Sequence, residues 1–187
     1  MDAALLREVH AHQAITDVIY RYGRALDRMD AELALSCWHE GGTDDHAPLF
    51  AGTAKEFVKW LWPVHAAMEL TRHVISNIQI ALDGDRAGVE SYWTVTLRLT
   101  GTDGLRYDVI GQGRYVDDFA FIDGRWAIMH RRSIHEWDRV EPVGRTMADP
   151  DVPATVKANN PGAPLTLPRR DRDDYSYGVL RGLGAHR

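Results

Sequence analysis

Residues 87–99 read AGVESYWTVTLRL, and apolar and polar side chains alternate along this stretch, as in a β-strand with one buried face. Three further runs of the same kind flank it, at 73–82, 105–119 and 125–137. Short turn sequences rich in Asp and Gly separate the four runs, at 83–85, 101–104 and 123–124. The pattern predicts four consecutive strands joined by hairpins into an antiparallel meander.

Helical periodicity occupies the chain before the strands. Apolar residues recur at helical spacing over 5–26, and Asp30 and Thr53 are N-cap candidates for a short second helix and for a third helix over 54–68. The stretch 39–52 contains three glycines, a proline and clustered Asp and His, which predicts a loop. Helices followed by a meander indicate an α+β fold in which three N-terminal helices cover one face of the sheet.

Two glycines interrupt the third strand run. Gly111 and Gly113 stand where glycine is typical of a bend or a bulge. Such a bend would curl the sheet into a half-cone. The hollow between a curled sheet and its helices is a natural small-molecule pocket.

Composition excludes several classes of protein. The chain has 187 residues, of which 44% are apolar and 26% charged, which predicts one globular core. A formal net charge of -5 argues against nucleic acids and anionic membranes as partners. Cys37 is the single cysteine, so an internal disulfide and a cysteine zinc site are excluded. No apolar run approaches the ~20 residues that span a bilayer, and the N-terminus does not resemble a signal peptide, so we expect a cytoplasmic protein.

The composition shifts after Val140 to a proline-rich segment. We therefore expect a compact α+β domain over residues 1–140. The C-terminal tail, 141–187, is expected to pack on its own or a neighbouring subunit.

Asp27 and His73 are the residues most able to carry acid–base chemistry. Asp27 ends the first helix and His73 begins the first long strand. If the two meet, the carboxylate accepts a proton from one imidazole nitrogen and leaves the other basic, as a general base requires. The alternative is structural, because Asp27 could instead form a surface ion pair with Arg28 and His73 could be a strand-edge residue with one satisfied hydrogen bond.

Four segments together resemble a known family. Residues 20–30 (YRYGRALDRMD), 71–77 (TRHVISN), 113–117 (GRYVD) and 124–128 (GRWAI) resemble the SnoaL-like branch of the nuclear transport factor two-like superfamily. The likeness covers about residues 5–140, and within the branch it points to the scytalone dehydratase, hexachlorocyclohexane dehydrochlorinase and bile-acid 7α-dehydratase families. It implies a cone-shaped, cystatin-like α+β barrel that forms a homodimer or homotrimer.

The resemblance also implies catalytic residues. Asp27 and His73 match the family's Asp–His dyad, and Tyr22 matches a tyrosine five residues before the aspartate. The family has an arginine on the last strand, for which Arg131 and Arg132 compete. Strand alternation favours Arg132, because it shares a face with the large apolar residues of that strand.

The function implied is a cofactor-independent, dehydratase-like lyase that binds no metal and acts on a hydrophobic, ring-containing small molecule. An isomerase, a cyclase or a non-catalytic small-molecule binding protein of the same fold remains an alternative, as does the small subunit of a ring-hydroxylating dioxygenase. Large aromatic residues are usually core, yet several of them and two histidines are candidates for lining a substrate pocket. These candidates are Trp38, His46, Phe57, Trp62, Trp93, Tyr115 and His130. For His46, in a segment with Asp44 and Asp45, a solvated loop is the competing interpretation.

Overall fold

The computed structural model describes residues 2–145 and 166–180. Three helices precede the long strands: α1 (Ala3–Asp27), α2 (Ala31–Leu35) and α3 (Ala54–Ala66). Two short strands lie among them, β1 (Trp38–His46) and β2 (Phe50–Thr53). Four long strands follow: β3 (Leu70–Asp83), β4 (Arg86–Thr100), β5 (Arg106–Ile122) and β6 (Arg125–Pro142). A short helix, α4 (Tyr175–Val179), lies near the C-terminus.

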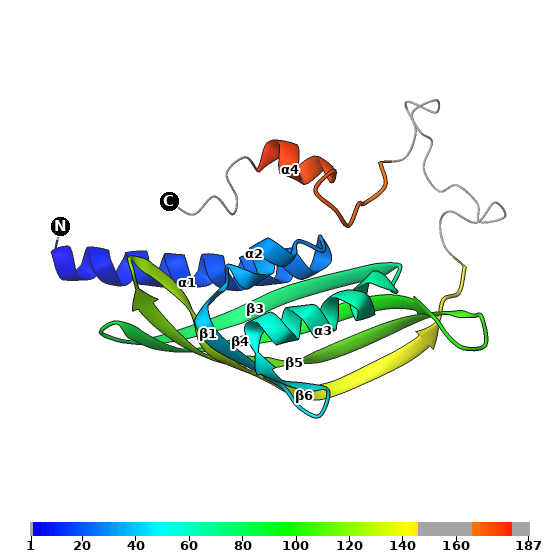
Figure 1. Cartoon of the computed structure of the whole chain (residues 1–187), viewed down its shortest axis with the longest axis horizontal. Helices are drawn as coiled ribbons and strands as arrows, with labels where there is room; N and C mark the ends of the chain where they lie inside the picture. Colours follow the sequence, from blue (N-terminus) through cyan, green and yellow to red (C-terminus); the bar gives the residue numbers. More distant parts are fainter. Residues whose placement is uncertain (1, 146–165, 181–187) are drawn as a thin grey trace.

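The six strands form one curled sheet in the order β2-β1-β6-β5-β4-β3. Strands β3 to β6 pair antiparallel as predicted, whereas β1 pairs parallel with β6. The sheet is therefore mixed rather than wholly antiparallel. The sheet curves beneath α1, α2 and α3, which lie together on one of its faces (Figure 1). The predicted α+β fold, a curved sheet with N-terminal helices, is confirmed.

The prediction of a loop over 39–52 is wrong, because β1 and β2 occupy most of this stretch. The residues are polar, yet Asp44 and Asp45 pair with the β6 residues Arg131 and Arg132. Pairing with an existing strand supplies the hydrogen bonds that the local sequence does not favour, which is why propensity alone missed this strand.

The helices begin where their caps predict. The Asp30 side chain accepts from the Leu33 amide at the start of α2. Thr53 and Glu56 form a reciprocal capping box at the start of α3. Pro63 lies inside α3 without ending it.

Two register shifts bend the sheet between β5 and β6. One lies between Gln112 and Gly113, where a side chain on Gly113 would collide with the Ile134 carbonyl and the Trp93 ring. This supports the predicted bend at the glycines. The other lies between Asp118 and Phe119, whose β6 partners are His130 and Ile128, so Met129 is an extra residue on β6. An extra residue reverses the alternation of faces that follows it, here from Met129 to the shift at Gly113, where Glu136 is also extra.

The described part of the tail, residues 166–180, runs beside α1 and α2 (Figure 1) and bonds to residues of its own chain. The rest of the expected tail, 146–165 and 181–187, lies outside the described residues. Among the helices of the described segments, none is long and apolar enough to cross a membrane.

Candidate functional site

Asp27 and His73 meet at the junction of α1 and β3. His73 Nδ1 lies 2.7 Å from Asp27 Oδ1. The His73 backbone N–H also donates to both carboxylate oxygens, at 3.1 and 2.9 Å. The carboxylate therefore fixes both the backbone and the ring of His73. With Nδ1–H donating to Asp27, the lone pair of His73 is left on Nε2.

The helix α1 and the strand β3 pack closely where Asp27 meets His73. Gly23 on α1 faces β3 so closely that a Cβ there would lie 3.5 Å from His73 Cβ and 3.5 Å from an Ile75 carbon. The side chains of His73 and Asp27 are only 7% and 14% exposed. The pair is sheltered from water yet not sealed, as a proton-transferring group requires.

A second imidazole, which the sequence analysis missed, stands beside the dyad. The His65 ring lies 6.0 Å from the His73 ring, and His65 is buried near the end of α3. The pKa of His65 is lowered to about 3, mainly by burial, and the nearby His73 and Arg170 contribute in the same direction. His65 is therefore neutral at physiological pH. Its spacing of four residues from Leu61 and eight from Phe57 places it on the apolar face of the helix, a signal that was present in the sequence.

Arg131 lies at the centre of the interior. Its guanidinium donates to both oxygens of Asp117, at 2.8 and 2.7 Å, and both side chains are fully buried. The guanidinium also packs over the rings of Tyr22 and Tyr115, at 4.2 and 4.1 Å from their centroids. Burial raises the pKa of both phenols, so both stay protonated and able to donate.

Asp44 and His46, both on β1, form a second carboxylate–imidazole pair. His46 Nδ1 hydrogen-bonds to Asp44 Oδ1, and the Asp44 side chain is fully buried. The His46 ring stacks on Phe57 of α3 at 4.8 Å and meets the Tyr115 ring at 5.9 Å. His46 thus belongs to the interior rather than to a solvated loop.

Several buried polar atoms of this interior have no hydrogen-bond partner among the described residues. They include Tyr22 Oη, Asp44 Oδ2 and Arg131 Nη1, and also the indole nitrogens of Trp38 and Trp93. Buried groups of this kind are normally satisfied, so unused capacity concentrated in one place is typical of a site for water or for a ligand's polar group.

Two predicted site residues are misplaced. Arg132 and His130 face the outer side of the sheet: the Arg132 side chain is 63% exposed and pairs with Asp45, and His130 bonds to Thr43. The reason is the extra residue Met129, which reverses the strand faces, so that Arg131 points inward in place of Arg132. The expectation that Arg132 and His130 line the interior is therefore wrong.

The aromatic candidates belong to the hydrophobic core or pack against it. Trp38, Phe57, Trp93 and Tyr115 are buried in the core, and Trp62 is half-buried on α3. Ring contacts connect Tyr22 with Trp38 at 5.4 Å and Trp93 with Tyr115 at 5.9 Å. Of these rings, Tyr22, Trp38 and Tyr115 pack against the Arg131 guanidinium.

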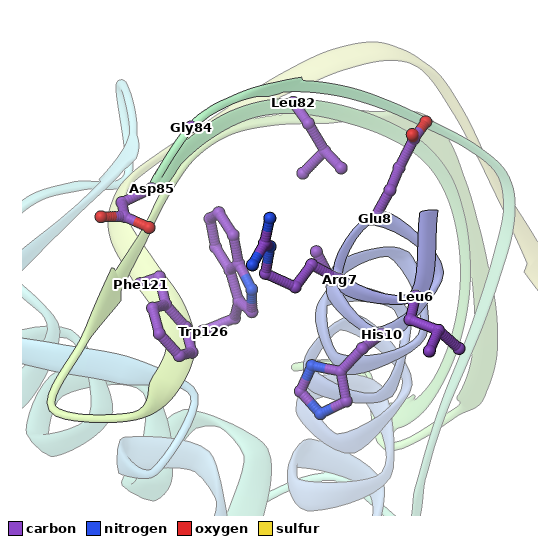
Figure 2. A pocket seen from close by; sticks show the side chains of 10 residues that line it. Leu6, Arg7, Glu8, His10, Leu82, Gly84, Asp85, Phe121 and Trp126 are labelled. Carbon is purple, nitrogen blue, oxygen red and sulfur yellow. The ribbon is translucent and has the colours of Figure 1, made fainter. Parts of the chain in front are cut away.

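A separate cavity of about 630 Å³ opens near the N-terminal end of α1. Its walls come from α1, from the β3–β4 turn and from two aromatic residues of β5 and β6, Phe121 and Trp126 (Figure 2). None of the sequence-predicted site residues lines it.

A curled mixed sheet with three N-terminal helices on one face, and an Asp–His pair where α1 meets β3, defines the class of α+β fold. Residues 7–132 match the profile of the SnoaL-like domain, which is more than half of the chain. The protein belongs to the SnoaL-like family, as the sequence motifs predicted.

Solved structures of the same fold agree with this assignment. A candidate scytalone dehydratase from Novosphingobium aromaticivorans superposes with a TM-score of 0.64 at 25% identity, over 74% of this chain and 97% of its own. A hexachlorocyclohexane dehydrochlorinase superposes with a TM-score of 0.67 at 16% identity, over 79% and 99%. A protein of unknown function with a cystatin-like fold from Nostoc punctiforme gives 0.55 at 23% identity, over 67% and 90%. No curated protein matches the chain.

Proposed function

We propose that this protein is a cofactor-independent lyase that eliminates a leaving group from a hydrophobic, ring-containing small molecule. The main support for this proposal is the 2.7 Å contact between Asp27 and His73, which leaves Nε2 of His73 as a base in a sheltered position. The likeness to a candidate scytalone dehydratase at 25% identity supports a dehydration in particular.

The proposed reaction is a β-elimination. His73 Nε2 takes a proton from the carbon next to a carbonyl, and the electrons of that C–H bond pass into the carbonyl oxygen. They then return to form the carbon–carbon double bond as the C–O bond of the β-hydroxyl breaks. The leaving hydroxide takes the proton from the His73 imidazolium and departs as water, so the β-hydroxy ketone becomes a conjugated enone plus water and His73 is again a free base. Asp27 stabilises the imidazolium that His73 becomes.

The negative charge that develops on the carbonyl oxygen must be stabilised by hydrogen-bond donors. Tyr22 and Arg131 are the proposed donors, because Tyr22 Oη and Arg131 Nη1 are both buried and unpartnered within the described part of the chain. A preorganised donor of this kind contributes ~3 kcal/mol to the transition state. Arg131 takes the role that the sequence analysis gave to Arg132, which is exposed.

The test is turnover of ring β-hydroxy ketones, beginning with 3-hydroxycyclohexanone. Ultraviolet absorbance of the conjugated enone and mass spectrometry of the product follow the reaction. His73→Ala and Asp27→Asn are each expected to lower kcat/KM by at least about 10²-fold, the usual contribution of a general base. His135→Ala is the matched control, because the His135 side chain is 55% exposed and paired with Asp138.

The product distinguishes the alternatives. Loss of water supports the lyase, whereas a product of unchanged mass would identify an isomerase or a cyclase. Equal turnover in wild type and His73→Ala would exclude the dyad as the base.

A further inference from the structure

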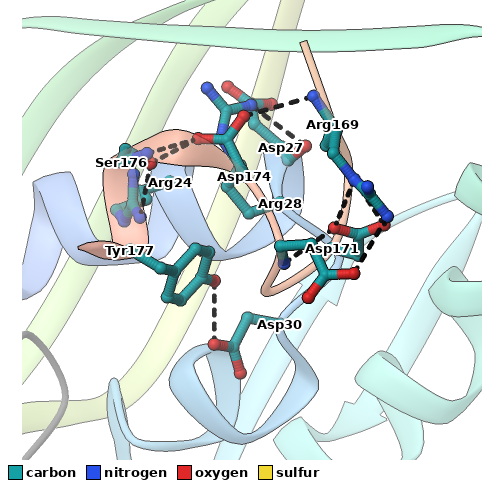
Figure 3. A network of polar contacts seen from close by, with 10 residues as sticks. Arg24, Asp27, Arg28, Asp30, Arg169, Asp171, Asp174, Ser176 and Tyr177 are labelled. Atoms are coloured by element: carbon teal, nitrogen blue, oxygen red, sulfur yellow. Dashed lines mark hydrogen bonds and ion pairs between the residues drawn. The ribbon is translucent and has the colours of Figure 1, made fainter. Parts of the chain in front are cut away.

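The C-terminal segment 166–180 is fastened to the corner between α1 and α2. Arg172 donates to Asp30 at 3.0 Å and to Glu32 at 2.8 Å. The Tyr177 hydroxyl donates to the same Asp30 carboxylate at 2.9 Å. Arg172 and Tyr177 thus hold the segment to one buried carboxylate, and Figure 3 shows the contact of Tyr177 with Asp30.

Further contacts hold the segment on α1. Asp174 lies 3.5 Å from Arg28, and Arg24 donates to Ser176 at 3.0 Å. The Arg24 guanidinium also packs 4.7 Å over the Tyr177 ring. Arg24 and Arg28 stand on the last turn of α1 and just beyond it, beside Asp27 of the dyad (Figure 3).

One side chain of this segment enters the fold. Arg170 donates to the backbone carbonyls of His65 and Met68, at 2.8 and 2.6 Å, where α3 ends. It also reaches Thr71 Oγ1 at 3.1 Å and Met29 Sδ at 3.3 Å. A single guanidinium thus contacts the end of α3, the start of β3 and the turn that follows α1.

These contacts lie next to the dyad in the chain. Met29 lies two residues after Asp27, and Thr71 lies two residues before His73. Burial lowers the pKa of Arg170, and the negative charge of Asp27 opposes this shift, which places the guanidinium within electrostatic reach of the dyad carboxylate. Arginine remains protonated in proteins, so its positive charge persists there.

We infer that Arg170 is a positioning residue of the active site, which holds the end of α1 against the start of β3 so that Asp27 and His73 stay in contact. The inference rests on the proposed function, in which the dyad is the base. A planar guanidinium with five N–H donors can bind acceptors from three elements at once, which an ammonium group cannot do with the same geometry. Its charge also suits the carbonyl end of a helix such as α3.

The neighbouring arginine supplies a matched control. Arg169 carries the same charge, but its side chain is 53% exposed and pairs with Asp171 and Asp173 of its own segment. Substitution of Arg169 therefore removes one positive charge from the same segment without touching α3, β3 or the dyad.

The experiment compares full-length wild type, Arg170→Ala, Arg170→Lys and Arg169→Ala by amide hydrogen exchange and by ¹⁵N NMR of the histidine rings. The His73 amide, which donates to Asp27, is expected to exchange about tenfold faster in Arg170→Ala, while the β5–β6 amides keep wild-type rates. The His73 Nδ1–H signal is expected to broaden in the same variant. Arg170→Lys should be intermediate, and Arg169→Ala should match wild type within about twofold.

Three results would overturn the inference. These are wild-type exchange at His73 in Arg170→Ala, equal effects of Arg170→Ala and Arg169→Ala, or a uniform loosening that includes the β5–β6 amides. Should Arg170→Ala fail to fold, the comparison of Arg170→Lys with Arg169→Ala decides in the same way. Because none of these measurements depends on turnover, they separate this inference from the proposed lyase activity.

Discussion

At Tyr22, substitutions can distinguish the packing of the ring from the proposed chemical role of the hydroxyl. The ring is buried between Trp38, Tyr115 and Arg131, whereas Oη has no partner among the described residues. A buried hydroxyl without a partner has lost its hydrogen bonds to water and has gained none in the protein, so it does not stabilise the fold. The energetic consequences of deleting the ring and of deleting the oxygen should therefore differ sharply.

Tyr22→Phe is expected to leave the free energy of unfolding unchanged or slightly raised, within ~1 kcal/mol. It should nonetheless lower kcat by about 10²-fold if Oη donates to the developing oxyanion. Urea unfolding and turnover of the ring β-hydroxy ketones measure the two effects. Tyr22→Ala is the contrasting variant, expected to cost ~3–5 kcal/mol through the lost ring. Equal stability losses in the two variants would contradict this division.

The adjacent residues Arg131 and Arg132 on β6 should differ in how much each contributes to the free energy of unfolding. Arg131→Ala would leave Asp117 buried without its partner, which is expected to cost ~3–5 kcal/mol in urea unfolding. Arg132→Ala should cost less than ~1 kcal/mol, because its ion pair with Asp45 is at the surface. The opposite order of losses would show that Arg132, not Arg131, faces the interior.

Among the elements, the β5–β6 ladder depends on one close approach. Gly113→Ala would drive a methyl group into the Ile134 carbonyl and the Trp93 ring. Since neither the ladder backbone nor the buried ring can easily move, we expect a loss of at least ~2–3 kcal/mol in chemical unfolding. Gly88→Ala on β4, where the added carbon meets nothing within 4 Å, is the control and should stay within ~1 kcal/mol. Similar losses at both positions would argue against the close approach at Gly113.

The long elements could be predicted from the sequence because period and turn chemistry agree there. The turns at 83–85 and 123–124 and the alternation between them predicted β4 and β5 to within a few residues. Strand β1 could not be predicted in this way, because its polar residues are ordered by pairing with β6. The faces of β6 were also beyond a local pattern, since Met129 is an extra residue only relative to the strand beside it.

The candidate site likewise has residues that a sequence motif could predict and residues that only the tertiary structure identifies. Asp27 and His73 could be placed together because the family motifs put one at the end of a helix and the other at the start of the strand that this helix end meets. Arg170 could not, since two of its acceptors are backbone carbonyls at the end of α3 and just beyond it, which leave no mark on residue type. His65 shows a helical pattern typical of core, and only its distance from His73 identifies it as part of the site.

Across the whole molecule, α3 spans the interior between two carboxylate–imidazole pairs. Its residue Phe57 stacks on His46, and its residue His65 lies beside His73. The two α3 residues are eight positions apart, which is about 12 Å along a helix. The pairs therefore serve different positions in the interior, and only the pair with His73 lies beside the segment that carries Arg170.

Burial of neutral His65 links this architecture to the stability of the whole protein. Its pKa is about 3 in the folded state, whereas an unfolded histidine titrates near ~6.5. Between these values the unfolded chain binds more protons, so the free energy of unfolding falls as the pH falls below ~6.5, by at most ~1.4 kcal/mol per pH unit from this residue. Above ~6.5 His65 contributes no pH dependence.

Replacement of this titrating group should flatten the acid side of the stability profile. Urea unfolding of wild type and His65→Asn at pH 7 and pH 5 is expected to show a loss on acidification that is ~1–2 kcal/mol smaller in the variant, whatever its stability at pH 7. His135→Asn, at an exposed position, should keep the wild-type slope. An unchanged slope in His65→Asn would mean that the folded protein accommodates a charged His65, and a neutral imidazole could then no longer be assigned beside His73.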